Sequence, residues 1–183
     1  MNISPALQRV DANLIGPDAT TPDRLLGYGA ATTGTLVAVA AGAHAGYSSW
    51  VLLVLGLVGF DLFGGATTNA MDAAKRWWYR PGQTSRHHFV FVALHIQPFV
   101  VAWTVPGFGW WTALATYLTV LVGAVVVLVA PPSLRRPAGF TVTTVASTVI
   151  LTVADVPAAI VWFVPVLLIK LLLAHLQPES ASR

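Results

Sequence analysis

The chain contains no cysteine, and this absence excludes several kinds of chemistry. Disulfide bonds, thiolate nucleophiles and cysteine metal ligands are all ruled out. Charged residues are also scarce, at 9% of 183 residues, whereas soluble proteins carry about 25%. Because 56% of the residues are hydrophobic, so few charges do not suffice to cover a soluble surface. The composition therefore predicts an integral membrane protein.

Acidic residues are rarer than basic ones, seven against ten, which leaves a net charge of +3. A basic excess can indicate nucleic-acid binding, but such proteins gather their basic residues into patches or tails. Here the basic residues are scattered between apolar runs. Nucleic acid is therefore not a predicted partner, and we expect the basic residues to face anionic lipid head groups.

Six apolar runs approach the roughly 20 residues that a membrane-spanning helix needs. They lie at 24–46, 50–73, 88–105, 110–130, 139–155 and 157–176. The predicted fold class is all-α, a polytopic bundle of six transmembrane helices over residues 24–176. The fifth run is the shortest, and we interpret Asp155-Val156-Pro157 as a tight turn after it. A kink within one long helix is the alternative.

Residues 1–23 and 177–183 are predicted to lie outside the bundle. The first segment has no basic region ahead of an apolar run, so it does not match a signal peptide. Within it, "SPALQRVDANLIG" favours an amphipathic helix on the membrane surface, capped by Ser4 and with Pro5 at its first position. A disordered tail is the alternative. "TPDR" from Thr21 then provides a cap and a first-turn proline for the first span.

The basic residues alternate with the predicted spans. If the N-terminus is cytoplasmic, the predicted outer loops contain no lysine or arginine. Cytoplasmic loops are enriched in these residues, so the pattern favours two cytoplasmic termini in a multi-pass protein of the cell membrane. The residues on the inner side are Arg9, Arg24, Lys75, Arg76, Arg80, Arg86, Arg135, Arg136 and Arg183, with Lys170 near the inner end of the last span.

Small residues recur every four positions on the first span, at Gly34, Ala38, Gly42 and Gly46. Such a row lets a neighbouring helix approach closely. We interpret it as packing within the chain rather than as a dimerisation motif.

A polar stripe follows the second span. At 100° per residue, its members fall within about 100° of arc. A charged aspartate facing lipid at mid-depth costs about 2.5–3.5 kcal/mol, so the stripe is expected to face the bundle interior. Gly64 and Gly65 lie beside it and are expected to leave room for a ligand or a helix contact. The stripe consists of Asp61, Gly65, Thr68, Asn69, Asp72 and Arg76.

The third span carries a matching face. His88 and His95 are seven residues apart and therefore about 20° apart on a helix, whereas Gln97 is expected to point the opposite way. Pro98 removes a backbone donor and frees the Leu94 carbonyl, so a kink is expected beside His95. In the last span, Lys170 either extends to the interface or pairs with an aspartate. His175 is expected to be interfacial and inert.

These residues predict a polar site that opens toward the cytoplasmic leaflet. The preferred hypothesis is acid–base catalysis on a lipid or isoprenoid-like substrate, with Asp61, His95, Asn69 and Asp72 as catalytic residues. Proton-coupled transport and a purely structural role are the alternatives. A metal held by His88, His95 and an aspartate is a lesser one, and no cofactor is predicted. The expected substrate-binding residues are Gly64, Gly65, Lys75, Arg76, Arg80, Arg86, His88 and Lys170.

Overall fold

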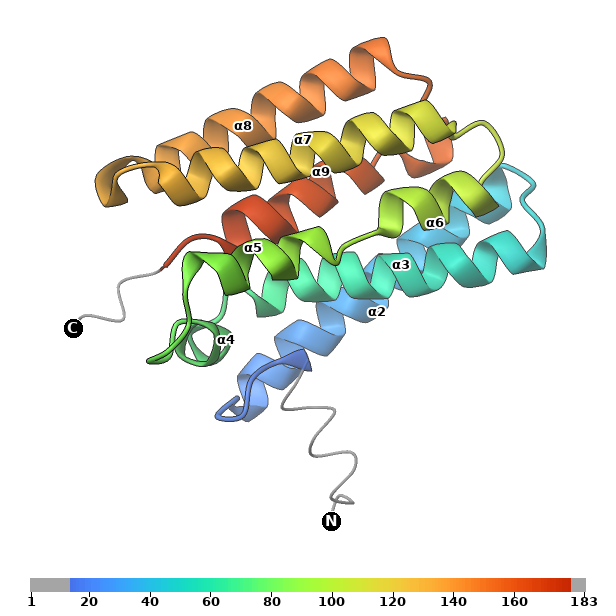
Figure 1. The fold of residues 1–183 in the computed structure, drawn as a ribbon. Helices are drawn as coiled ribbons and strands as arrows, with labels where there is room; N and C mark the ends of the chain where they lie inside the picture. Colours follow the sequence, from blue (N-terminus) through green and yellow to red (C-terminus); the bar gives the residue numbers. More distant parts are fainter. Residues whose placement is uncertain (1–13, 179–183) are drawn as a thin grey trace.

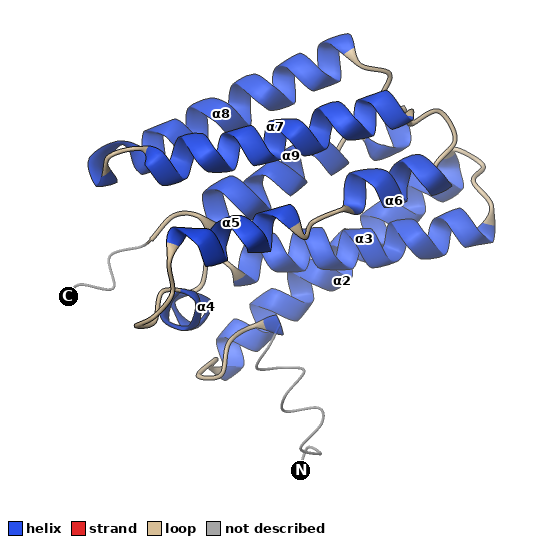
Figure 2. Ribbon diagram, in the orientation of Figure 1, coloured by secondary structure: helices blue, strands red, loops and turns tan. Residues whose placement is uncertain are grey.

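The computed structural model describes residues 14–178. This part of the chain is helical and contains no strand (Figure 2), so the all-α class is confirmed for it. The helices lie alongside one another in a bundle, with most connections at its two ends (Figure 1). The amphipathic helix expected from Ser4 falls mainly on residues 1–13, which lie outside the described residues.

The helices are of three kinds. Most are α-helices, a short 3₁₀ turn (η1) precedes the last of these, and a π-helix (η2) follows it. The elements are α2 (Thr21–His44), α3 (Ser49–Thr68), α4 (Asp72–Trp78), α5 (Ser85–Ala93), α6 (Gln97–Thr104), α7 (Trp110–Val129), α8 (Pro132–Val153), η1 (Ala158–Ile160), α9 (Phe163–Leu168) and η2 (Ile169–His175).

Four helical segments among the described residues are long and apolar enough to cross a membrane. They are Thr21–His44, Ser49–Thr68, Trp110–Val129 and Ala158–His175. The other two predicted spans take different forms. The predicted span 88–105 is divided into α5 and α6, and α8 starts at Pro132, before the expected start of the fifth span. Because α8 thereby includes two arginines, its mean hydropathy is lower than a simple apolar run would have.

Helices α2 and α3 pack closely because glycines line their contact. A Cβ on Gly34 would lie 2.4 Å from the Cβ of Phe63, and a Cβ on Gly59 would lie 2.7 Å from the Gly34 carbonyl oxygen. Gly34, Ala38 and Gly42 are buried on this face, as the small-residue row predicts. Gly46 lies beyond the helix, where its φ of +76° suits a turn.

The residues ahead of α2 fold back against α4. Ile15 is 1% exposed and packs with Ala19, Met71 and Ala73. Gly16 approaches the Ala73 backbone with a φ of +124°. Ile15 therefore packs on protein. The cap of α2 is Thr20 rather than Thr21, since the Asp23 backbone amide donates to the Thr20 hydroxyl at 3.3 Å.

The second span ends earlier than predicted, at Thr68 instead of residue 73. Asn69 caps the helix, and the Met71 amide donates to the Thr68 carbonyl in a tight turn. A new helix, α4, then begins at Asp72. The predicted stripe is therefore divided between two helices, because angles of 100° per residue do not carry across a turn.

The third span breaks beside His95, as Pro98 predicts. Helix α5 ends at Ala93, α6 starts at Gln97, and the Ile96 amide donates to the Leu94 carbonyl at 3.0 Å. The proline has no amide hydrogen for that carbonyl. The expectation that Gln97 points away from the site is wrong, since the break resets the direction of the side chains that follow it.

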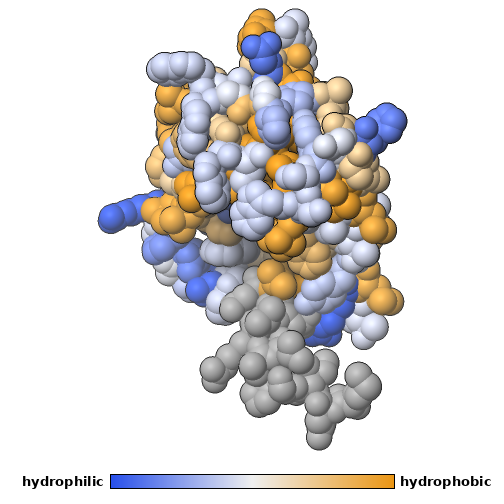
Figure 3. All heavy atoms as spheres, turned by 90° about the vertical axis from the view of Figure 1, so that its right-hand side faces the viewer, coloured by the Kyte–Doolittle hydropathy of each residue, from blue (hydrophilic) through white to orange (hydrophobic). Residues whose placement is uncertain are grey.

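The two ends of the bundle differ in polarity. Figure 3 views the end that carries the α2–α3, α6–α7 and α8–η1 connections. This face is mostly pale to orange, and strongly hydrophilic residues appear only at its margin. The opposite end carries α4, the start of α5 and the described C-terminal residues (Figure 1), and the candidate site lies toward it.

Candidate functional site

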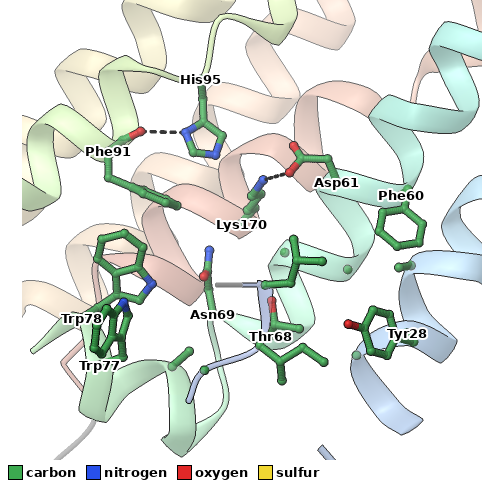
Figure 4. Close-up of a pocket in the computed structure, with 18 residues that line it drawn as sticks. Tyr28, Phe60, Asp61, Thr68, Asn69, Trp77, Trp78, Phe91, His95 and Lys170 are labelled. Atoms are coloured by element: carbon green, nitrogen blue, oxygen red, sulfur yellow. Dashed lines mark hydrogen bonds and ion pairs between the residues drawn. The ribbon is translucent and has the colours of Figure 1, made fainter. Parts of the chain in front are cut away.

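A cavity of about 330 Å³ lies between α2, α3, α4, α5 and η2. We call it the polar pocket. Its walls include the aromatic side chains of Tyr28, Phe60, Trp77, Trp78 and Phe91 (Figure 4). The structure brings six of the sequence-predicted site residues to this one cavity, namely Asp61, Gly64, Gly65, Asn69, His95 and Lys170.

An ion pair lines the pocket and reaches the protein surface at Asp61. The Lys170 ammonium is 2.7 Å from one carboxylate oxygen of Asp61, and the Gln97 amide donates to the other oxygen at 2.9 Å. The Lys170 side chain is 4% exposed, whereas that of Asp61 is 45% exposed. The cation is thus held inside the protein, while the carboxylate stands toward the outside.

The two glycines make room for the protein rather than for a ligand, although both line the pocket. A Cβ on Gly65 would lie 2.4 Å from Cε of Lys170, so the lysine side chain crosses the helix at this position. A Cβ on Gly64 would lie 2.8 Å from Cβ of Ala31 on α2. Gly65 therefore allows the ion pair to form, and Gly64 allows α2 to pack.

Lys170 is the second residue of the π-helix η2. A π-helix closes i→i+5 hydrogen bonds and is rare, and such turns occur frequently at functional sites. Here the Leu176 amide donates to the Leu171 carbonyl at 3.2 Å, which is a bond of this type. The wider turn changes the directions of Lys170 and His175 from those that α-helical spacing predicts.

His95 is held in one orientation by its own backbone. Its Nδ1 is 2.7 Å from the Phe91 carbonyl oxygen. A carbonyl only accepts hydrogen bonds, so Nδ1 carries the hydrogen and, in the neutral ring, Nε2 is an acceptor. Figure 4 shows this second nitrogen turned toward Lys170 and Asp61. The pocket thus contains a positioned base.

Asn69 contributes an unpaired amide. Its side chain is 8% exposed, and its Nδ2 is buried without a hydrogen-bond partner. In Figure 4 the Asn69 nitrogen points up into the space between Trp78 and Lys170. Buried polar groups in proteins are nearly always hydrogen-bonded, so an unpaired one indicates a missing partner such as a ligand or a water molecule.

The remaining predicted site residues lie outside the pocket. Asp72 is exposed at the first position of α4, and Arg76 and Arg86 are also exposed. The Arg80 guanidinium stacks 3.8 Å from the Trp77 ring centre. Lys75 is buried, in contrast to the exposed basic cluster expected of it, and its ammonium donates to the carbonyls of Ala174 and Gln177. These contacts follow from the α3–α4 turn, which rotates Lys75 toward η2.

His88 belongs to a second group of side chains, which we call the histidine cluster. It consists of Trp78, Tyr79, His88, Phe91 and His175. His88 Nδ1 is 3.2 Å from His175 Nε2, Tyr79 stacks on His88 with ring centres 4.4 Å apart, and Phe91 stacks on His175 at 3.9 Å. His175 is 1% exposed, so the expectation that it is interfacial is wrong.

Tyr79 closes the cluster on the α4 side. Its hydroxyl donates to the His175 carbonyl at 2.9 Å. Burial raises the pKa of the Tyr79 phenol well above its usual value of 10.0, against a smaller lowering effect from Arg135. The tyrosine therefore stays a hydrogen-bond donor at neutral pH, where it binds a carbonyl at the end of η2.

The alternative metal set is not assembled. His95 lies in the polar pocket, His88 lies in the histidine cluster, and Asp72 is exposed. Between residues 14 and 178, no group of three or more histidine or acidic side chains is placed to hold a metal ion.

Sequence reasoning missed two contributors, Gln97 and the paired tryptophans. Gln97 binds Asp61 because the helix breaks before Pro98. The sequence predicts this break, and helical spacing does not apply to residues beyond a break. Trp77 and Trp78 are not among the predicted site residues, but both line the pocket. Their position depends on the turn after Thr68.

No protein-family model, curated protein or solved structure matches the chain. The pocket itself offers an acceptor at His95 Nε2, a free amide donor at Asn69, and an ammonium–carboxylate pair within apolar and aromatic walls.

Proposed function

We propose that the chain crosses the cell membrane six times with both ends in the cytoplasm. The four long apolar helices supply four crossings, the α5–α6 pair supplies one, and α8 supplies one. Large apolar side chains are exposed all round the bundle, including Leu57 at 64%, Trp103 at 69% and Val122 at 63%, which suits contact with lipid. The absence of lysine and arginine from the three connections at one end supports the orientation.

Reporter fusions test this topology. Fusions after Arg86 and after Arg136 are expected to report the cytoplasm, and a fusion within residues 106–109 is expected to report the outside. A cytoplasmic signal from the 106–109 fusion would overturn the six-span proposal.

Within this topology, the polar pocket is the site of an acid–base enzyme that acts on a lipid or isoprenoid-like substrate. One observation carries the proposal: ionisable groups from three separate segments converge on one cavity whose remaining walls are mostly apolar or aromatic. Ionisable residues are rare in membrane helices and usually mark a working site. The aromatic walls suit the apolar part of an amphiphile, and the polar atoms suit its head.

The geometry assigns a role to each group. His95 Nε2 is the general base, because the Phe91 carbonyl holds Nδ1–H and stabilises the imidazolium that forms when Nε2 takes a proton. The Lys170 ammonium stabilises negative charge that develops on the substrate oxygen. Asp61 and Gln97 hold Lys170 and its partner carboxylate in place.

His95→Gln tests the proposal. Glutamine keeps a donor and an acceptor, so a structural hydrogen bond persists and stability falls by only about 0.6 kcal/mol. It does not titrate near neutrality, so proton transfer is lost. We expect the variant, purified in lipid nanodiscs, to retain its melting temperature and to accumulate a lipid that mass spectrometry does not find in the wild type.

His44→Gln is the matched control, because His44 is exposed at the far end of α2. Its bound lipids are expected to equal those of the wild type. If His95→Gln lowers the melting temperature strongly and leaves the lipids unchanged, the acid–base role is refuted and the role of His95 is structural.

Proton-coupled transport is a second candidate, favoured by the break between α5 and α6. Broken helices that expose backbone groups near mid-membrane are typical of transporter sites. Here the break places His95 beside the Asp61–Lys170 pair. Proteoliposomes with a pH-sensitive dye inside distinguish the two functions, since a transporter acidifies them with substrate outside and an enzyme does not.

A further inference from the structure

The exposed residues that line the polar pocket are mostly apolar. Leu14 is 47% exposed, Phe60 is 37% exposed and Trp77 is 37% exposed, whereas Asp61 is the charged exception, with its side chain 45% exposed. The three apolar residues come from the segment before α2, from α3 and from α4. Such a mostly apolar border suits a molecule that arrives from the lipid with its chain still in the bilayer.

The charges inside the pocket already balance. Lys170 is the one lysine or arginine among the pocket-lining residues that the structure describes, and Asp61 neutralises it at 2.7 Å. A phosphate or carboxylate head would lie beside the Asp61 carboxylate, where like charges in a poorly solvated site repel strongly. The pocket is therefore unsuited to an anionic head, and the exposed arginines outside it do not change this.

A donor and an acceptor among the described pocket-lining residues are available to a ligand. Asn69 Nδ2 is a buried donor without a partner, and His95 Nε2 is the free acceptor of a ring whose Nδ1 is occupied. A hydroxyl group accepts one hydrogen bond and donates another, so it satisfies both atoms. An ester or ether oxygen satisfies only Asn69, and a hydrocarbon satisfies neither.

Building on the proposed acid–base function, we infer that the substrate is a long-chain or isoprenoid alcohol with an uncharged head. Its hydroxyl oxygen accepts from Asn69, its hydroxyl hydrogen faces His95 Nε2, and its chain leaves between Phe60 and Trp77. A volume of about 330 Å³ is near the lower end for ligand pockets, which are about 300–1,000 Å³, so the pocket holds the head while most of the chain stays in lipid.

Photo-crosslinking tests this inference with two probes of equal chain length, a diazirine-bearing C15 alcohol and its phosphate monoester. The wild type is held in nanodiscs of neutral phospholipid, so that head-group charge does not concentrate either probe. We expect the alcohol to label peptides that contain Phe60 or Trp77 at least tenfold more than the phosphate does. Equal or stronger labelling by the phosphate would overturn the inference.

A competition experiment with the wild type avoids any problem of folding. Excess unlabelled dodecan-1-ol is expected to suppress the labelling by the alcohol probe, whereas dodecane at the same concentration is not. If dodecane competes equally, the head makes no specific contact and the inference fails.

Asn69→Leu tests the predicted donor, since leucine has a similar size and no hydrogen-bonding atoms. Its alcohol labelling is expected to fall about five- to tenfold, the effect of one hydrogen bond to a neutral group. Gln83→Leu, which makes the same kind of change outside the polar pocket, is expected to label normally. Undiminished labelling of a folded Asn69→Leu variant would refute the role of Asn69 and with it the alcohol assignment.

The outcomes separate this inference from the proposed function. Selective labelling by the alcohol together with an unchanged lipid content in His95→Gln would leave the alcohol site standing and refute the acid–base role. The opposite combination, a His95-dependent lipid together with preferred labelling by the phosphate, would keep the enzyme and replace its substrate class.

Discussion

The polar pocket and the histidine cluster are neighbours made from the same elements. The cluster takes His88 from α5 and His175 from η2. The pocket takes His95, which lies just past the end of α5, and Lys170 from η2. Phe91 lies between them, with ring centres 3.9 Å from His175 and 4.6 Å from His95. Both regions contain buried ionisable groups, so burial alone does not tell them apart.

They differ in how easily their polar groups are reached. In the cluster, stacked rings enclose the two histidines, and Lys75 and Tyr79 bind the carbonyls at the end of η2. In the pocket, Asp61 is half exposed and Asn69 lacks a partner. The comparison teaches that access, rather than burial or an unpaired polar atom, distinguishes the two regions, because His175 Nδ1 in the cluster is also buried without a partner. On this criterion we propose that the pocket is the working site and that the cluster is structural.

The largest effect on stability is expected next to the histidine cluster, at Lys75. Lys75→Met removes the donor of two buried carbonyls at the end of η2, and each buried unsatisfied group costs about 1–3 kcal/mol. We expect a loss of about 3 kcal/mol, measured by unfolding in detergent micelles. The control Arg76→Met changes the exposed neighbouring cation and should cost less than about 0.5 kcal/mol. Similar losses for both would mean that Lys75 has no structural role.

A smaller effect is expected at the ion pair in the pocket. Asp61→Ala leaves the Lys170 ammonium buried without its partner, and breaking a buried pair in this way costs about 3–5 kcal/mol. Because the Asp61 side chain is half exposed, we expect a smaller loss of about 2 kcal/mol. Asp72→Ala, at an exposed aspartate, is the control and should be near neutral.

The double variant Asp61→Ala with Lys170→Met sharpens this result. It removes both charges, so it should recover more than half of the loss caused by Asp61→Ala alone. If the stability loss of the double variant equals the sum of the losses of the two single variants, the two charges do not stabilise each other. The description of the pocket as internally neutral would then be wrong.

The smallest effect concerns Tyr79 and depends on pH. At neutral pH, Tyr79→Phe loses one hydrogen bond, or about 1 kcal/mol. Because burial raises the folded-state pKa above 10.0, the folded protein retains a proton that the unfolded chain releases above that pH. The wild type should therefore lose stability as pH rises beyond 10, by up to about 1.4 kcal/mol per pH unit. The difference between wild type and Tyr79→Phe should shrink in that range, and a constant difference would contradict the proposed burial of Tyr79.

Parts of the site were predictable because they depend on short, unbroken stretches of helix. Asp61, Gly65 and Asn69 share one face of α3, as their spacing predicts, and all three line the pocket. The prediction failed for Asp72 beyond the turn at Asn69 and for Gln97 beyond the break at His95. In both cases the spacing of 100° per residue was applied across a point where the backbone is not helical.

The amino-acid sequence by itself determined the all-α class, the apolar helices, the close contact of α2 with α3 and the break beside His95. These features follow from local chemistry, since hydropathy sums residue by residue, small side chains permit close packing and proline lacks an amide hydrogen. Only the tertiary structure decided that Lys170 pairs with Asp61, that His88 meets His175, and that Lys75 is buried. Each of these contacts joins residues 87 to 109 positions apart. The partners of these residues depend on how the helices rotate and pack against one another. That rotation is set by the turn after Thr68 and by the π-helix, and helical spacing rules predict neither of these two features.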